Sequence, residues 1–178
     1  MSDNIETKKI LYDNAAKGVQ SQIERKKEID SKTFNMLSVT LILLGLVIEF
    51  VNIGDIFNYN IDINMPNILI LVLMFLIYIA VIVLSILIII RYIIILKGKP
   101  YRTINPEMYI DKGEKSKNKD EILDDFLEEL VKSEKANSAI NEKQMKMYDT
   151  NGILVIIVVV MSIILNVGLN IIATIIVK

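Results

Sequence analysis

The most restrictive feature of this sequence is an apolar run without a single charged side chain, residues 68–90. At about 1.5 Å of rise per residue, a helix over this run is long enough to cross ~30 Å of hydrocarbon. Two further apolar runs have similar lengths. A buried helix of a soluble core is the alternative, but an uncharged run this long disfavours it. We therefore expect an all-α membrane protein with three transmembrane helices, at residues 34–53, 68–96 and 151–177.

The distribution of Lys and Arg predicts how these helices are oriented. Residues 1–33 contain seven basic side chains, the connection 54–67 contains none, and residues 91–149 contain twelve. Basic residues near the ends of transmembrane helices stay in the cytoplasm. Residues 1–33 and 97–150 are therefore predicted to be cytoplasmic, and residues 54–67 to form an outer loop. With three spans, the N-terminus is expected in the cytoplasm and the C-terminus outside.

Both cytoplasmic parts show helical patterns. No Pro interrupts residues 1–53, which predicts one helix from about residue 4 to about residue 51. Its apolar stripe leaves Ile29 off the face. After the second span, Lys97-Gly98-Lys99-Pro100 is typical of a helix end. A new helix is expected from about residue 119 onward. Its predicted apolar face contains Leu123, Phe126, Leu127, Leu130 and Val131, and then continues more weakly through Ala136, Ala139, Ile140, Met145 and Met147.

Polar side chains recur every four residues in the third predicted span, and therefore lie on one face of that helix. They are Ser162, Asn166, Asn170 and Thr174. An Asn in hydrocarbon is unfavourable unless it finds a hydrogen-bond partner. One interpretation is a pore lining, in which copies of this helix surround an axis. The other is a helix–helix interface joined by hydrogen bonds. Both favour tight packing within the chain or a homo-oligomeric bundle.

A basic segment with nearby tyrosines precedes the second cytoplasmic helix. It contains Tyr101, Arg102, Lys112, Lys115, Lys117 and Lys119. Tyrosine stacking combined with basic contacts is a common way to hold single-stranded nucleic acid. The alternative is a solvated loop that meets anionic lipid headgroups. We therefore list these residues as candidate ligand contacts.

The residue inventory argues against catalysis. The chain has no His and no Cys, so the usual general base, thiolate nucleophile and zinc ligands are absent from the sequence. It also lacks a glycine-rich phosphate loop. We expect a protein that is not an enzyme, with no catalytic residues, no metal and no cofactor.

Two stretches carry a resemblance to a known class of proteins. Residues 21–50, "SQIERKKEIDSKTFNMLSVTLILLGLVIEF", resemble the entry helix of small membrane effectors of bacterial antiphage systems. Residues 141–159, "NEKQMKMYDTNGILVIIVV", resemble the entry to their last span. The general layout is similar to SLATT-like effectors, and more narrowly to Hailong-type channel effectors, which pair with a nucleotidyltransferase that makes DNA oligomers.

The resemblance implies a homo-oligomeric channel in the bacterial inner membrane, held shut by an oligonucleotide on its cytoplasmic side. Opening would depolarise the infected cell. The implied partners are the lipid bilayer, further copies of the chain, and a nucleotide or DNA oligomer made by a partner nucleotidyltransferase. The resemblance assigns no ligand residue. The leading hypothesis is thus an oligonucleotide-gated ion channel of antiphage defence, and the alternative is a non-conducting membrane accessory or immunity protein.

Overall fold

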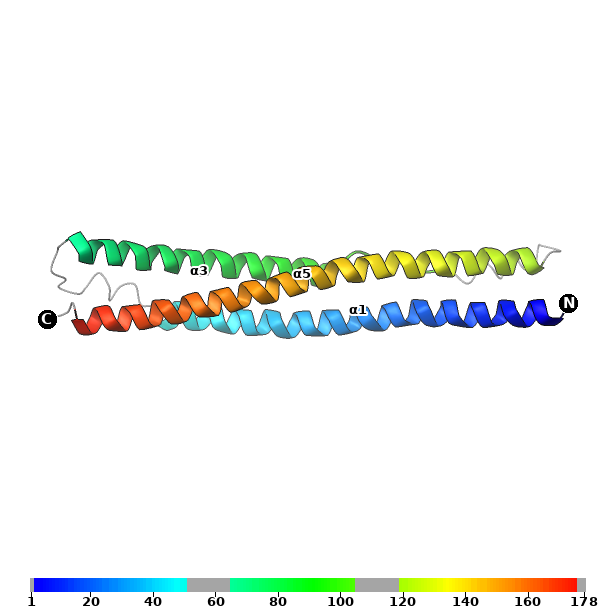
Figure 1. The fold of residues 1–178 in the computed structure, drawn as a ribbon, viewed down its shortest axis with the longest axis horizontal. Helices are drawn as coiled ribbons and strands as arrows, with labels where there is room; N and C mark the ends of the chain where they lie inside the picture. Colours follow the sequence, from blue (N-terminus) through cyan, green and yellow to red (C-terminus); the bar gives the residue numbers. More distant parts are fainter. Residues whose placement is uncertain (1, 51–64, 105–118, 176–178) are drawn as a thin grey trace. The chain divides into compact units, whose positions relative to one another are not determined.

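The computed structural model describes residues 2–50, 65–104 and 119–175, and their regular secondary structure is entirely helical (Figure 1). Helix α1 spans Ser2–Phe50, α3 spans Met65–Lys97 and α5 spans Lys119–Ile175. Each helix contains a segment that is long and apolar enough to cross a membrane. The predicted fold class, an all-α protein with three membrane-spanning helices, is confirmed.

The ends of the helices follow from local chemistry. The single helix predicted from about residue 4 is α1, which runs without a break because no Pro interrupts it. Helix α3 ends at Lys97, and Gly98 adopts a φ of 51°. This left-handed conformation is favourable for Gly because it has no Cβ. Helix α5 is continuous over 57 residues, so the second cytoplasmic helix and the third span predicted from the sequence are one helix.

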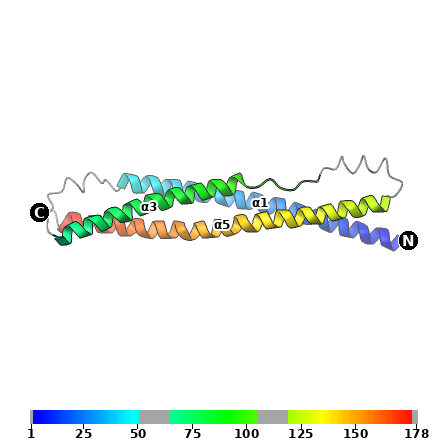
Figure 2. The same cartoon turned by 90° about the horizontal axis from the view of Figure 1, so that it is seen from above.

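The chain forms two compact units, which we describe separately. The polar unit contains Met1–Ser31 and Lys97–Lys146, and the apolar unit contains Lys32–Leu96 and Met147–Lys178. Helices α1 and α5 each contribute to both units, whereas α3 belongs to the apolar unit except for its last residue. Figure 2 shows the same helices from a second direction.

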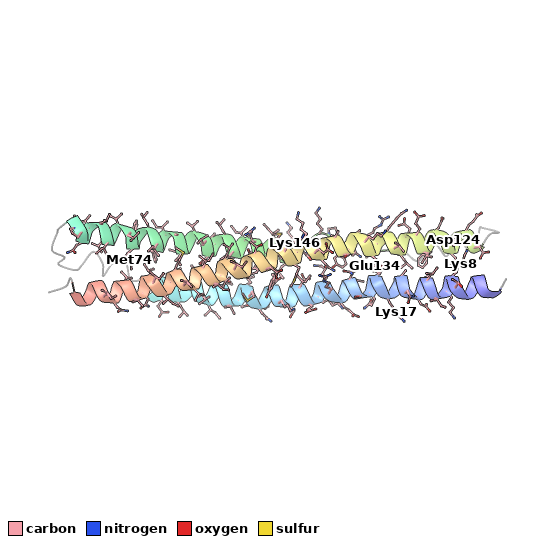
Figure 3. All side chains as sticks on the ribbon, in the orientation of Figure 1. Lys8, Lys17, Met74, Asp124, Glu134 and Lys146 are labelled. Carbon is pink, nitrogen blue, oxygen red and sulfur yellow. The ribbon has the colours of Figure 1, made fainter. Side chains whose placement is uncertain are left out.

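In the polar unit, α1 and α5 run parallel. Lys8 of α1 contacts Asp124 of α5, and further along both helices Gln22 contacts Asn141. Figure 3 labels the first of these pairs. Between them, the rings of Tyr12 and Phe126 stack with centroids 5.5 Å apart. Ile29 is only 3% exposed, so the prediction that it falls off the buried face of α1 is wrong.

The buried face of α5 in the polar unit also differs from the prediction. After Leu130, its buried positions are Ser133, Asn137, Asn141 and Gln144. Of the residues predicted to continue the apolar face more weakly, Ala136, Ile140, Met145 and Met147 are half-buried, and Ala139 is exposed. We call the three buried amide residues, Asn137, Asn141 and Gln144, the amide ladder. Its spacings of three and four residues keep it on one side of the helix.

In the apolar unit, α3 runs antiparallel to α5. Tyr92 and Tyr148 have ring centroids 6.3 Å apart, and Asn151 donates to the carbonyl of Ile88 at 3.4 Å. Buried residues recur at spacings of three, four or seven on α3 and α5, as in left-handed helix packing. They are Met74, Val81, Ser85, Ile88, Tyr92 and Ile95 on α3, and Asn151, Val155, Val158 and Leu165 on α5.

Most of the apolar surface of this unit remains uncovered. Only 17–22% of the most apolar window of each helix is buried within the chain. Large aliphatic side chains such as Leu69, Ile156 and Ile163 are more than half exposed. An apolar surface of this extent is incompatible with water and matches a lipid environment.

Candidate functional site

The polar face of α5 in the apolar unit is the first candidate site. The hydroxyl of Ser162 donates to the carbonyl of Val158 at 2.7 Å, within its own helix. The side-chain amide of Asn170 donates to the Asn166 carbonyl at 3.0 Å and to Asn166 Oδ1 at 2.8 Å. Both Asn side chains are exposed. Thr174 lies within α5, but its side chain lies outside the described residues.

Two of these polar residues open onto a groove between α1 and α5. The groove has a volume of about 320 Å³. It is lined by Leu43, Leu46 and Val47 of α1, and by Val159, Ser162, Ile163, Asn166 and Val167 of α5. Asn170 lies one turn further along α5. The structure therefore keeps Ser162, Asn166 and Asn170 on one side of the helix, as predicted from their spacing.

The Asn166 side chain holds more hydrogen-bonding capacity than its contact with Asn170 uses. An amide side chain offers two N–H donors and an oxygen acceptor. The contact between Asn166 and Asn170 employs one oxygen of Asn166 and the nitrogen of Asn170. Because Asn166 is exposed in a segment surrounded by apolar side chains, hydrocarbon would leave this capacity unsatisfied. Water or another protein surface would satisfy it.

A second cluster lies in the polar unit, where the chain leaves α3. Residues 98–104 are non-helical, and we call them the strap. The Tyr101 hydroxyl contacts the Gln22 carbonyl at 3.1 Å and Asn141 Oδ1. Asn141 in turn donates to the Gln22 carbonyl at 2.9 Å and to its side-chain oxygen at 3.0 Å. Burial is the main cause that raises the pKa of the Tyr101 hydroxyl, so it is neutral and able to donate at physiological pH.

The neighbouring strap residue is held through its backbone. Asn137 Oδ1 accepts from the Arg102 N–H at 2.9 Å, and Asn137 Nδ2 donates to the Arg102 carbonyl at 3.2 Å. The Arg102 guanidinium pairs with Glu129 at 2.7 Å. The Lys26 ammonium lies 5.7 Å from the centroid of the Tyr101 ring. The strap is thus attached to both α1 and α5.

The structure separates the predicted ligand residues into two groups. Tyr101 and Arg102 both contact residues of the same chain, and Arg102 is the more exposed of the two. Lys112, Lys115 and Lys117 lie outside the described residues, and Lys119 begins α5 with a side chain that is not described. The two described members therefore make structural contacts within the polar unit.

Asn137 and Asn141, which organise the second cluster, were not predicted from the sequence. Their four-residue spacing, followed by Gln144 three residues later, is the same kind of signal that singled out Asn166 and Asn170. The face predicted for this part of the chain was drawn from its apolar residues alone, such as Ala136 and Ile140, and included neither amide.

The described helices define a class, that of multi-pass all-α membrane proteins. Comparisons of the chain with protein family models, with curated proteins and with solved structures found no match.

Proposed function

We propose that this chain is a membrane effector that assembles into a homo-oligomeric ion channel, with the Ser162, Asn166 and Asn170 face of α5 directed toward the pore. The exposure of both Asn side chains within a membrane-spanning segment carries this proposal. A water-filled axis between copies would satisfy amide groups that hydrocarbon cannot.

Gating is proposed to come from the cytoplasmic side, which the distribution of Lys and Arg assigns to the polar unit. Helices α1 and α5 each run through both units without a break. A displacement of either helix in the polar unit would therefore reach the transmembrane segment. By the resemblance described above, the ligand would be an oligonucleotide, and opening in the bacterial inner membrane would depolarise an infected cell.

A non-conducting accessory protein is the second candidate. The groove beside Ser162 and Asn166 favours it, because a helix of a neighbouring copy could fill this groove and use the amides as interface hydrogen bonds. In that case the same face would join copies of the chain, and no water would reach it.

Cysteine accessibility distinguishes these candidates, because the chain contains no Cys of its own. Asn166→Cys tests the polar face, and Ile164→Cys is a matched control at an exposed position on another side of α5. Conductance would be measured in planar bilayers before and after a charged, membrane-impermeant thiol reagent. A pore predicts block at position 166 and none at 164. Conductance that is unaffected at both positions would remove α5 from the pore, and the absence of any conductance or depolarisation in cells would favour the accessory protein.

The ligand is tested separately. Short single-stranded DNA oligomers would be titrated against the purified chain and against a variant with Gln at Lys112, Lys115, Lys117 and Lys119. We expect weaker binding by the variant, with a smaller dependence on salt. Binding that is unchanged would exclude these lysines as the ligand contacts.

A further inference from the structure

Side-chain amides make most of the strap's hydrogen bonds within the described residues. Asn137 contacts the backbone of Arg102, and Asn141 together with Gln22 surrounds the Tyr101 hydroxyl. Asn137 is 1% exposed and Asn141 is 0% exposed, so these amides are fully covered when the strap is in place. The strap continues directly from Lys97, the last residue of α3, and begins with Gly98.

Asn137 recognises backbone and not side chain. Its amide pairs with both the N–H and the carbonyl of one residue, as an adjacent strand does in a sheet. The contact therefore requires residue 102 to be extended and positioned against α5, whatever its side chain. The ion pair of Arg102 with Glu129 lies outside this contact, at a partly exposed position where such pairs contribute little.

The chemistry of this docking surface suits attachment that can be reversed. An aliphatic surface would be exposed to water unfavourably on release, whereas water can replace the hydrogen bonds made by Asn137 and Asn141. A parallel helix pair is stabilised more by Leu or Ile at such positions, and buried amides favour specificity over stability. The pairing of α1 with α5 has its own contacts, such as the stacked Tyr12 and Phe126, which do not involve the strap.

We propose that residues 98–104 form a releasable latch, which holds the chain leaving α3 against α1 and α5 and can detach without unfolding that helix pair. The latch does not depend on the proposed channel function. Its test measures local exposure and not conductance, so failure of one proposal leaves the other unaffected.

Ser133 provides a probe beneath the latch. It lies on α5 between Glu129 and Asn137, one turn from each, and both of these residues contact Arg102. Ser133 is 0% exposed, and its hydroxyl has no hydrogen-bond partner within the described residues. Ser133→Cys therefore introduces a thiol of similar size without removing a contact. Ala15→Cys, at a buried position of α1 in the same unit, is the control for general opening.

The full-length protein would be labelled in detergent with a small maleimide, and the labelling rate compared among latch variants. Asn137→Ala removes both hydrogen bonds to Arg102 and should raise the labelling rate of Cys at position 133 about tenfold. Tyr101→Phe removes only the hydroxyl contact and should raise it less. Glu129→Gln removes the exposed ion pair and should change the rate less than about threefold. The Cys at position 15 should label slowly in all variants.

Several outcomes would overturn the latch. One is fast labelling of the Cys at position 133 when no latch residue is substituted. Another is a labelling rate at position 133 that neither Tyr101→Phe nor Asn137→Ala changes. The third is an equal rise in the labelling rate of the Cys at position 15. Circular dichroism of each variant verifies that the helices remain intact. If Asn137→Ala does not fold, Tyr101→Phe alone carries the test, because it removes one oxygen atom and leaves the ring in place.

Discussion

Packing between α5 and α3 in the apolar unit depends on Gly168. A Cβ atom added at this position would lie 2.4 Å from the terminal carbon of Met74 and 3.1 Å from its sulfur. Met74 is buried, and Figure 3 labels it on α3. Gly168→Ala therefore forces the end of the Met74 side chain to move. This close approach explains why a residue without a side chain stands here, between the two Asn residues of the polar face.

The magnitude follows from two opposing effects. Ala favours a helix over Gly by about 1 kcal/mol in water. Overpacking a well-packed site costs about 1–3 kcal/mol, and the flexible end of a Met places this case toward the lower end. Gly152→Ala is the matched control on the same helix, because nothing lies within 4 Å of its added Cβ. We therefore expect Gly168→Ala to be about 1–2 kcal/mol less stable than Gly152→Ala.

The assay is unfolding of the detergent-solubilised protein by increasing fractions of sodium dodecyl sulfate, followed by circular dichroism. A double-mutant cycle with Met74→Ala tests the cause, since removing the Met side chain leaves room for the new methyl group. The two substitutions should then show a favourable coupling of about 1 kcal/mol. Equal stabilities of the two Gly variants, or the absence of coupling with Met74, would refute the reasoning.

Three further predictions concern polar contacts. Asn151→Leu should be as stable as the natural chain or more so, because Asn151 makes only a long hydrogen bond to Ile88 and its buried side-chain oxygen has no partner among the described residues. Asn151→Ala should lower the free energy of unfolding by about 1–2 kcal/mol in the same assay. Asp124→Asn should lower the pKa of Lys8, because the hydrogen bond to Asp124 raises that pKa. The stability that this pair contributes is present at neutral pH and is lost as the pH rises through the Lys8 pKa. Nitrogen NMR of the Lys8 side chain across the alkaline range measures the pKa in both proteins. Asn137→Ala should shift the ligand concentration at which the response of the proposed channel is half-maximal in bilayer recordings. An unchanged concentration would show that release of the latch does not affect gating.

The sequence was sufficient to predict helices α1 and α3 and the end of α3. Long apolar runs and the lack of Pro before residue 65 predict α1 and α3, and the Gly98 turn ends α3 where expected. The continuity of α5 was less visible, because the composition changes sharply near residue 150. The change in composition matches a change of surroundings from water to lipid. The helical backbone continues through it, so the change does not mark the end of a helix.

The candidate sites were predicted less completely, for reasons that lie in side-chain direction. The spacing of Ser162, Asn166 and Asn170 was enough to place them on one face, since helix geometry decides it. The sequence shows that Tyr101 and Arg102 can form hydrogen bonds, but it does not show where their side chains point. In the structure, the Tyr101 hydroxyl points to the buried Asn141. Burial of Asn137 and Asn141 depends on a strap that approaches from a distant part of the sequence, which no local period can reveal.

Helix α5 uses two kinds of buried side chain on one repeating face, and the change between them follows from the surrounding solvent. In the polar unit the face is the amide ladder, and in the apolar unit, after Asn151, it becomes Val155, Val158 and Leu165. Within lipid, burial of aliphatic groups adds little, because lipid tails are equally apolar; close packing such as that at Gly168 must hold the helices together. In water, aliphatic groups at the ladder would bind the strap more tightly than amides do. The amides are therefore best explained by a need to release the strap, whereas Asn166 and Asn170 are exposed on the surface of the apolar unit.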